Sequence, residues 1–176
     1  MQEKTMKTNT VYSGRIINIL KDEIILPNGN QSDREVVEHS GGVCVLPLTD
    51  DDTVIMVKQF RYPFKEALLE LPAGKREPDE DPLECGKREL LEETGYSAKK
   101  FDYLGKLYPT PAYCTEVIHM YLARELSKGK NNLDPDEFLE VVEFPFDKVI
   151  DMIFRNEIPD AKTQFAMLKT KVLLNN

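Results

Sequence analysis

The stretch from Gly74 to Gly95 constrains the fold of this chain more than any other part of its sequence. Asp81 suits the residue that caps the start of a helix, and Pro82 suits the first helical position. Gly95 is free to take the left-handed conformation in which helices commonly end. The pattern therefore predicts a helix that begins near Pro82 and ends at Gly95, preceded by a loop that starts at Gly74.

Three carboxylates gather on one face of this predicted helix. Glu89, Glu92 and Glu93 stand at positions i, i+3 and i+4, which are neighbours on a helix surface. Like charges at this spacing destabilise a helix unless something neutralises them, and Mg²⁺ selects carboxylate and carbonyl oxygens. Arg88 can pair with Glu92 or brace the loop. The alternative is a solvated acidic face, but the glycine-led loop, the arginine and the terminal glycine favour a metal site.

The whole stretch resembles the Nudix box, which reads Gly, five residues, Glu, seven residues, then Arg-Glu-apolar-x-Glu-Glu-x-Gly-apolar. The matching residues are Gly74, Glu80, Arg88, Glu89, Leu90, Glu92, Glu93 and Gly95. Tyr96 departs from the pattern, because the family usually has an aliphatic residue there. The resemblance implies an α+β chain with the Nudix fold, an α/β/α sandwich in which a mixed sheet lies between helices. It also implies a metal-dependent hydrolase of diphosphate bonds.

The same resemblance assigns roles within the box and just before it. Glu89, Glu92 and Glu93, together with the backbone carbonyl of Ala73, are expected to bind Mg²⁺, with Mn²⁺ as the alternative. Bound ions would neutralise diphosphate oxygens and activate a water molecule, which makes Glu92 and Glu93 catalytic residues. The residues expected to be structural are Gly74, Glu80, Arg88 and Gly95.

Sequence on either side of the box resembles the ADP-ribose pyrophosphatase branch of the family. Residues 69–74 match its Leu-Glu-Leu-Pro-Ala-Gly entry, and residues 58–61 match a Lys-Gln-Phe-Arg stretch whose arginine binds substrate phosphates. A proline and a glutamate follow the box at the distance seen in that branch, although Ala112 replaces the usual glycine. The resemblance therefore implies a nucleoside diphosphate substrate, namely ADP-ribose. The implied substrate-binding residues are Arg61, Arg34, Glu116 and Pro111.

The segment from Ser127 to Glu137 is polar, with no helix or strand pattern, and is predicted to be a loop. In the resembling enzymes an acidic loop at this place supplies the base that activates water. Glu137 is the best positional match for this catalytic base, with Asp136 as the second choice. The alternative is an ordinary acidic surface loop with no role in catalysis.

The N-terminal part is predicted to form a small antiparallel β-sheet. Strand patterns cover Val11 to Leu20, Glu23 to Leu26 and Arg34 to His39, with a strong turn signal at residues 27–30. Residues 1–10 are predicted to be a frayed end. We therefore expect a β subdomain at residues 1–40 and a hydrolase domain at residues 41–176. In the resembling branch such a sheet is exchanged across a dimer, so the resemblance implies a homodimer.

The rest of the chain is predicted to supply further strands and two more helices. The strands are expected at Val43 to Leu48, Thr53 to Phe60, Phe101 to Leu107 and Val117 to Ala123. Apolar residues at helical spacing predict two amphipathic helices that cover the core. The expected core faces are Phe146, Val149, Ile150, Ile153 and Phe154 in one helix, and Ala161, Phe165, Leu168 and Val172 in the other.

The net charge and the cysteine content indicate which binding partners and which cellular compartment to expect. A net charge of −8 argues against nucleic acid or an anionic membrane as the partner, and no apolar run is long enough to span a membrane. The three cysteines show no metal-binding spacing, which favours a reducing cytoplasmic location. Two alternatives to ADP-ribose hydrolysis stay open: hydrolysis of another nucleoside diphosphate derivative, such as a nucleotide sugar or an oxidised nucleotide, and a non-catalytic ADP-ribose sensor.

Overall fold

The structure, a computed structural model, describes residues 1–129 and 138–175 and divides the chain into two compact units. The smaller unit consists of Met1–Gly41 and Tyr108–Val117, and the larger unit consists of Gly42–Leu107 and Ile118–Asn176. Among the described residues, no helix is long and apolar enough to cross a membrane.

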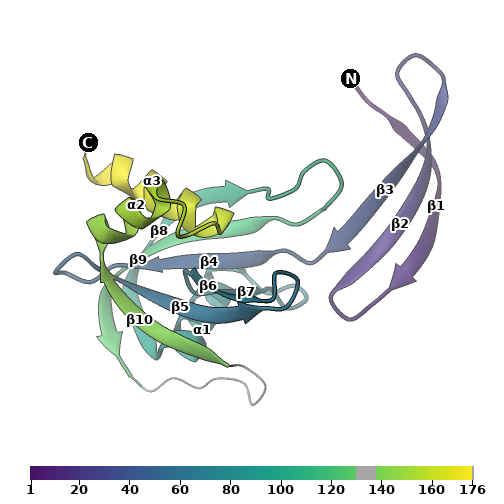
Figure 1. The fold of residues 1–176 in the computed structure, drawn as a ribbon. Coiled ribbons are helices and arrows are strands. Elements are labelled where there is room, and N and C mark those ends of the chain that lie inside the picture. Colours follow the sequence, from purple (N-terminus) through teal and green to yellow (C-terminus); the bar gives the residue numbers. More distant parts are fainter. Residues whose placement is uncertain (130–137, 176) are drawn as a thin grey trace. The chain divides into compact units, whose positions relative to one another are not determined.

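The smaller unit is built on a three-stranded antiparallel sheet. Its strands are β1 (Lys4–Ser13), β2 (Ile17–Ile25) and β3 (Gln31–His39), and β2 lies in the middle (Figure 1). Residues 108–117 attach to β3, because the N–H of Val37 donates to the carbonyl of Tyr113 at 2.7 Å and Thr115 donates to the carbonyl of Val37 at 2.9 Å. The small antiparallel sheet expected from the sequence is therefore confirmed.

Two details of the predicted N-terminal strands are wrong. Residues 4–10 are not frayed, because they pair with β2, with one register shift between Thr5 and Lys7, despite their polar composition. The strand predicted over Val11 to Leu20 is interrupted by a turn, in which the N–H of Gly14 donates to the carbonyl of Ile17 at 3.0 Å. A polar strand that is exposed on both faces carries little hydrophobic pattern, which is why β1 was missed.

The larger unit contains two sheets. In the first, β7 (Ala73–Lys75), β4 (Gly42–Pro47), β9 (Ile118–Lys128) and β8 (Tyr96–Leu107) lie in that order, with β4 and β9 parallel. In the second, β10 (Leu139–Pro145), β5 (Thr53–Arg61) and β6 (Glu66–Glu70) are antiparallel. The four predicted strands are confirmed, but β9 continues to Lys128, so the first residues of the predicted loop at 127–137 belong to a strand.

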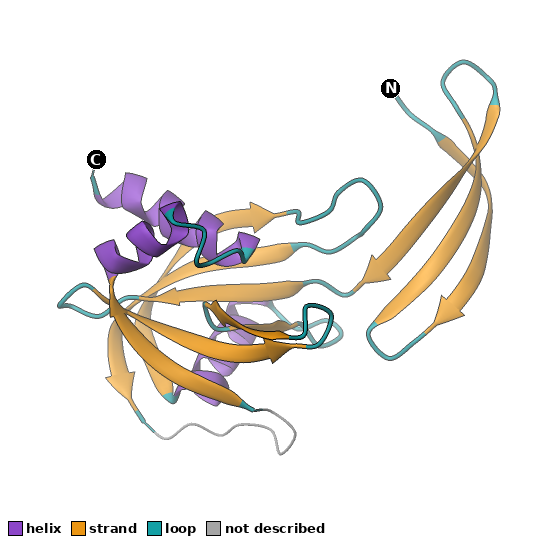
Figure 2. Cartoon of the chain, in the orientation of Figure 1, coloured by secondary structure: helices purple, strands orange, loops and turns teal. Residues whose placement is uncertain are grey.

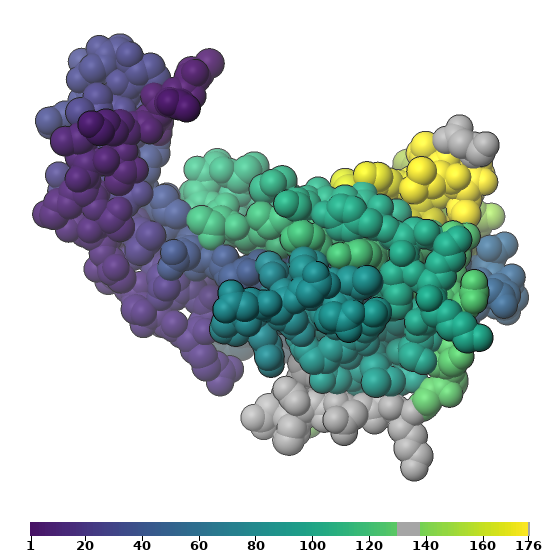
Figure 3. Space-filling model, turned by 180° about the vertical axis from the view of Figure 1, so that it is seen from behind, coloured from purple at the N-terminus to yellow at the C-terminus, as the bar shows by residue number. Residues whose placement is uncertain are grey.

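Helices cover both faces of the strands in this unit. Val43 and Val45 of β4 pack toward α1 (Pro82–Thr94), whereas Cys44 and Leu46 belong to the core beneath α2 (Phe146–Phe154) and α3 (Ala161–Leu174). Figure 2 shows α2 and α3 on one side of the strands and α1 on the other. Seen from behind, the teal surface of the segment around α1 covers much of the larger unit (Figure 3). The predicted α/β/α sandwich with a mixed sheet is confirmed.

The core face of α2 is confirmed except at its last residue. Phe146, Val149, Ile150 and Ile153 are buried, whereas Phe154 is 73% exposed. A residue eight positions along a helix has rotated by about 80° from the first, and here it leaves the buried face.

The predicted core face of α3 is confirmed only in part. Phe165 and Leu168 are partly buried and pack against the core, whereas Ala161 and Val172 are exposed. The residues that α3 buries are Thr163, Ala166, Met167 and Thr170. Thr163 is buried because its hydroxyl accepts a hydrogen bond from the N–H of Leu71 at 2.9 Å, so a polar residue marks the inner face.

The exposure difference in α2 can be tested by a matched pair of substitutions. Ile153→Ala should lower the free energy of unfolding by about 2 to 5 kcal/mol, because it leaves a cavity in the core. Phe154→Ala should change it by less than about 0.5 kcal/mol, because the side chain is exposed. Urea denaturation of the two variants measures both values, and equal losses would contradict the structure.

Candidate active site

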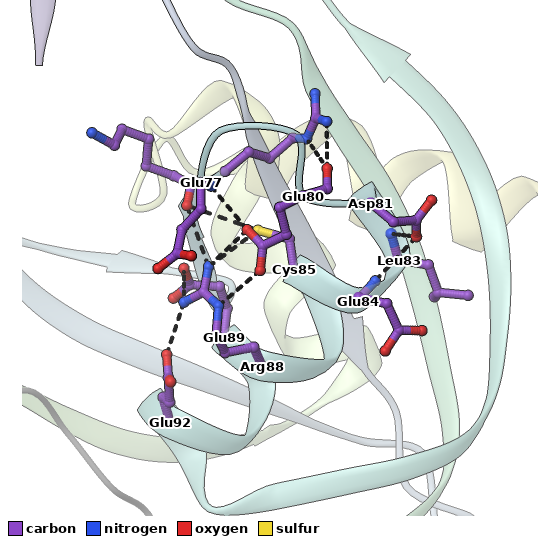
Figure 4. Close-up of polar contacts among 11 residues, drawn as sticks. Glu77, Glu80, Asp81, Leu83, Glu84, Cys85, Arg88, Glu89 and Glu92 are labelled. Atoms are coloured by element: carbon purple, nitrogen blue, oxygen red, sulfur yellow. Dashed lines mark hydrogen bonds and ion pairs between the residues drawn. The ribbon is translucent and has the colours of Figure 1, made fainter.

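The helix α1 begins and ends as the sequence predicts. The carboxylate of Asp81 accepts hydrogen bonds from the N–H groups of Leu83 at 2.9 Å and Glu84 at 3.3 Å, and Pro82 occupies the first turn (Figure 4). At the other end Gly95 has a φ of 74°, and its N–H donates to the carbonyl of Leu91 at 2.9 Å. Both ends of the helix are thus fixed by local hydrogen bonds.

Arg88 joins the loop before the helix to the carboxylates on the helix. Its Nε and Nη2 donate to the two carboxylate oxygens of Glu80 at 2.9 and 3.1 Å. Its Nη1 donates to Glu89 at 2.8 Å and to Glu92 at 2.9 Å (Figure 4). One guanidinium therefore balances part of the negative charge on this helix face, which like-charge repulsion would otherwise destabilise.

The pKa of Glu80 reflects this pairing. Hydrogen bonds from Arg88 lower it from the usual value to about 2, although burial acts in the opposite direction. The N–H of Glu77 also donates to the Glu80 carboxylate, at 2.9 Å. Glu80 and Arg88 therefore form a charged brace between the loop and the helix, and both are ionised at neutral pH.

Glu89 and Glu93 point into the protein and pack against the backbone of β7. Their exposed fractions are 8% and 3%. The carboxylate of Glu93 accepts a hydrogen bond from the N–H of Ala73 at 3.0 Å. A Cβ atom on Gly74 would lie 2.0 Å from the carboxylate of Glu89, so any larger residue at position 74 would displace this carboxylate from its place. Glu92, in contrast, is partly exposed beside Arg88.

These residues can contribute to a divalent metal site, although they do not complete one. Among residues 1–129 and 138–175, no group of three or more His, Cys, Asp or Glu side chains is arranged to hold a metal ion. Mg²⁺ commonly binds through one or two carboxylates and takes its other oxygens from water and substrate phosphates. Two buried carboxylates beside a strand backbone supply oxygen donors of this kind. The donor set therefore fits a hard cation that binds together with a phosphate-bearing ligand.

Arg61, at the end of β5, lies in the same unit as the box. Its Nε and Nη2 donate to the two oxygens of the Glu70 carboxylate at 2.6 and 2.7 Å. This hydrogen bonding raises the pKa of Arg61 against the effect of burial, and the charge of Glu93 also contributes. Arg61 is therefore close enough to Glu93 for the two charges to interact.

The other predicted site residues belong to the smaller unit or lie outside the described residues. Arg34, Pro111 and Glu116 belong to the smaller unit. There Arg34 forms a two-bond ion pair with Glu3, and Glu116 lies 3.7 Å from Nδ1 of His39. Glu137 and Asp136, the two predicted choices for the base, lie outside the residues that the structure describes.

Residues around Arg61 were missed by the sequence analysis. Glu70 is buried and is bonded by both Arg61 and Lys162, and Lys162 also donates to Asp160 at 2.9 Å. Glu70 carried a usable signal, because a lone carboxylate inside the apolar run at residues 68–71 must find a cation when it is buried. Lys162 carried no such signal, since a lysine in the first turn of a helix is ordinary.

Comparisons with known proteins agree with these observations. Residues 38–166 match the family model described as NUDIX domain, and residues 3–37 match the model of the nucleoside diphosphate sugar hydrolase N-terminal domain. The chain is 43% identical to an ADP-ribose pyrophosphatase of Bacillus subtilis (strain 168), over 95% of this chain and 91% of that protein. It is 40% identical to a methanol dehydrogenase activator of Bacillus methanolicus, over 94% and 91%.

Two further comparisons concern a relative with a different substrate in its name and a solved structure. A GDP-mannose pyrophosphatase of Escherichia coli (strain K12) is 32% identical over 84% of this chain and 91% of its own length. Among solved structures, one titled "Crystal structure of ADP compounds hydrolase" matches with a TM-score of 0.88 and 22% identity, over 99% of this chain and 95% of that chain. This structural likeness supports the fold.

The brace between Glu80 and Arg88 makes a pH-dependent contribution to stability. Because the pKa of Glu80 is lowered from 4.5 to about 2, the ionised brace stabilises the folded protein fully above pH 4.5. That contribution is lost as the pH falls toward about 2. Glu80→Gln should therefore be less stable than the wild-type protein at pH 7, and the difference should shrink below pH 4.5.

Urea denaturation at a series of pH values measures this difference. Glu84→Gln is the matched control, because Glu84 is exposed on the same helix and pairs only with Lys87 in the described hydrogen bonds of its side chain. It should cost less than about 1 kcal/mol at pH 7. A Glu80→Gln difference that stays constant from pH 7 to the acid limit would contradict the assignment.

Proposed function

The chain belongs to the Nudix family, and we propose that it hydrolyses the diphosphate bond of ADP-ribose to give AMP and ribose 5-phosphate. The observation that carries the proposal is the pair of buried carboxylates, Glu89 and Glu93, packed against Ala73 and Gly74 in an intact box. The similarity to an ADP-ribose pyrophosphatase over 95% of the chain supports this choice of substrate.

The box residues would hold the divalent cation. Glu89 and Glu93, with the Ala73 carbonyl, are the proposed ligands of Mg²⁺, with Mn²⁺ as the alternative, and Glu92 assists at the exposed edge. When bound there, the cation would neutralise diphosphate oxygens and favour ionisation of the attacking water. Arg88 limits the repulsion between these carboxylates, because it pairs with Glu89 and Glu92.

Other residues of the chain would bind substrate and move the proton. Arg61 presents a guanidinium, whose planar fork of donors matches phosphate oxygens. Glu137 is the proposed base, with Asp136 as the second choice, and would take a proton from water as its oxygen attacks phosphorus. The phosphorus–oxygen bond between the two phosphate groups then breaks, and each product keeps one phosphate.

The smaller unit would complete substrate recognition and form a homodimer. Arg34, Pro111 and Glu116 are the proposed substrate contacts in this unit, and residues 1–40 are the proposed dimerisation domain beside a hydrolase domain at 41–176. Exposed apolar side chains on and beside β1, including Val11 and Ile16, support an association of this kind. The three free cysteines support a cytoplasmic location.

Hydrolysis of a nucleotide sugar is the second candidate. It is supported by similarity to GDP-mannose pyrophosphatases, including one of Yersinia enterocolitica that is 37% identical over 80% of this chain. The match of residues 3–37 to a nucleoside diphosphate sugar hydrolase domain supports it too. An ADP-ribose sensor without activity has less support, because the box keeps all its carboxylates. A hydrolase of oxidised nucleotides has less support, because the relatives described above include ADP-ribose and GDP-mannose pyrophosphatases.

The test is product release from a panel of nucleoside diphosphate compounds in the presence of Mg²⁺. The panel contains ADP-ribose, GDP-mannose and an oxidised nucleoside triphosphate, and each is tested with the wild-type protein and with Glu93→Gln. ADP-ribose should be turned over fastest, and Glu93→Gln should reduce its kcat by about 100-fold or more, as the loss of a group that stabilises transition-state charge does.

Each other outcome identifies what is wrong. Faster turnover of GDP-mannose, again lost in Glu93→Gln, would contradict ADP-ribose as the preferred substrate and would still support metal-dependent hydrolysis of a diphosphate bond. Tight binding of ADP-ribose without release of AMP would contradict hydrolysis and support a sensor.

A further inference from the structure

Four charged side chains from β5, β6 and α3 form a connected set of ion pairs. Arg61 comes from β5, Glu70 from the end of β6, and Asp160 and Lys162 from the start of α3. Glu70 accepts from Arg61 at 2.6 and 2.7 Å and from Lys162, which also donates to Asp160 at 2.9 Å. We call these four residues the Glu70 cluster.

Stability alone does not explain the Glu70 cluster. The Glu70 side chain is only 2% exposed, and transferring a carboxylate out of water costs several kcal/mol or more. An apolar set of the same volume is often equally stable, so a buried ion pair is weak evidence for a stabilising role. Although burial opposes ionisation, Arg61 and Lys162 keep the pKa of Glu70 below its usual value. The Glu70 cluster therefore keeps a buried carboxylate ionised, at the cost of the free energy of its desolvation.

The arrangement fixes the orientation of one guanidinium. Both oxygens of Glu70 are engaged by Nε and Nη2 of Arg61, which leaves the plane of the guanidinium little freedom. Arg61 is the most exposed member of the cluster, at 37% of its side chain. In the described hydrogen bonds its Nη1 donates to no protein group. Arg61 is therefore a partly exposed guanidinium held in one orientation, and the charge of Glu93 acts on it.

The remaining members hold Glu70 to the neighbouring elements. Asp160 caps α3 by accepting from the N–H and hydroxyl groups of Thr163 at 3.0 and 2.6 Å. The Thr163 hydroxyl in turn accepts from the N–H of Leu71, which follows Glu70 directly and precedes the strand that packs on Glu89 and Glu93. Hydrogen bonds thus link Asp160 through Thr163 to Leu71, the neighbour of Glu70. Lys162 binds both Asp160 and Glu70, which are the two ends of this link between α3 and the segment before the box.

We propose that Glu70, held by Lys162, is a positioning residue that orients Arg61 to bind a phosphate group of the substrate. The proposal rests on the proposed function, in which Arg61 contacts the diphosphate. Glu70 would act through Arg61 and would not touch the substrate, so its loss should weaken substrate binding more than the chemical step.

The first variant is Glu70→Gln, assayed with Mg²⁺ and the substrate that the wild-type protein turns over fastest. Its KM should rise by about tenfold or more, because one oriented charge-assisted hydrogen bond to phosphate is lost. Its kcat should fall by a smaller factor, unlike that of Glu93→Gln. Lys162→Arg, which keeps the cation, should raise KM less than Lys162→Met.

A second variant separates positioning from folding. Glu70→Gln removes the carboxylate that accepts from both Arg61 and Lys162, which can destabilise the protein. The double variant with Glu70→Gln and Lys162→Met removes one charge of each sign, so its thermal midpoint should recover toward that of the wild-type protein while its KM stays high. All KM values are measured well below the thermal midpoint of each variant. Asp102→Asn, which breaks the exposed pair with Arg124, is the control and should keep KM within about twofold.

The outcomes are distinct. A wild-type KM in Glu70→Gln, a KM that recovers together with stability in the double variant, or a loss confined to kcat would overturn the proposal. If the wild-type protein hydrolyses none of the compounds, the proposed function itself fails, and phosphate binding by Arg61 then has no basis.

Discussion

The proposed site depends on the burial of two carboxylates, Glu89 and Glu93, against the backbone at Ala73 and Gly74. Buried carboxylates are costly unless they are hydrogen-bonded or paired. Here the N–H of Ala73 donates to Glu93, and Arg88 donates to Glu89. This packing depends on the distance between α1 and the short strand β7. Gly74 at the centre of β7 and the hydrogen bonds at both ends of α1 fix that distance.

A balance of charge extends outward from these two residues. Arg88 shares its donors among Glu80, Glu89 and Glu92, so that the loop before the helix and the helix itself are joined through one side chain. In the Glu70 cluster, Glu70 accepts hydrogen bonds from Arg61 and Lys162, and Lys162 also donates to Asp160. This cluster holds as many cations as carboxylates, whereas Arg88 offsets only part of the negative charge of its three carboxylate partners.

The box helix and the placement of its carboxylates could be predicted from the sequence because they are encoded locally, whereas the layered fold was implied by the resemblance to the Nudix box. Asp81, Pro82 and Gly95 fix α1 through neighbouring backbone groups, and a spacing of three and four residues is enough to place carboxylates side by side. Contacts between residues that lie far apart in the sequence could not be predicted from local patterns. The buried face of α3 is marked by a hydrogen bond between Thr163 and Leu71. The partner of Arg61 is Glu70, although the register of β5 and β6 places Glu66 opposite Arg61 and Val57 opposite Glu70. The polar strand β1 was missed because its partner strand, and not its own hydrophobicity, holds it in place.

Binding of Mn²⁺ followed by electron paramagnetic resonance tests the central claim most directly, because it reads the metal site without any assumption about the substrate. The wild-type protein, Glu89→Gln, Glu93→Gln and Glu84→Gln are titrated with Mn²⁺, with and without AMP as a phosphate-bearing ligand. Glu84→Gln, on the exposed face of the same helix, should bind like the wild-type protein, whereas the other two variants should lose about tenfold or more in affinity, as the removal of an ionised metal ligand requires. Equal Mn²⁺ affinity in all four proteins would contradict the claim that the buried carboxylates hold the metal.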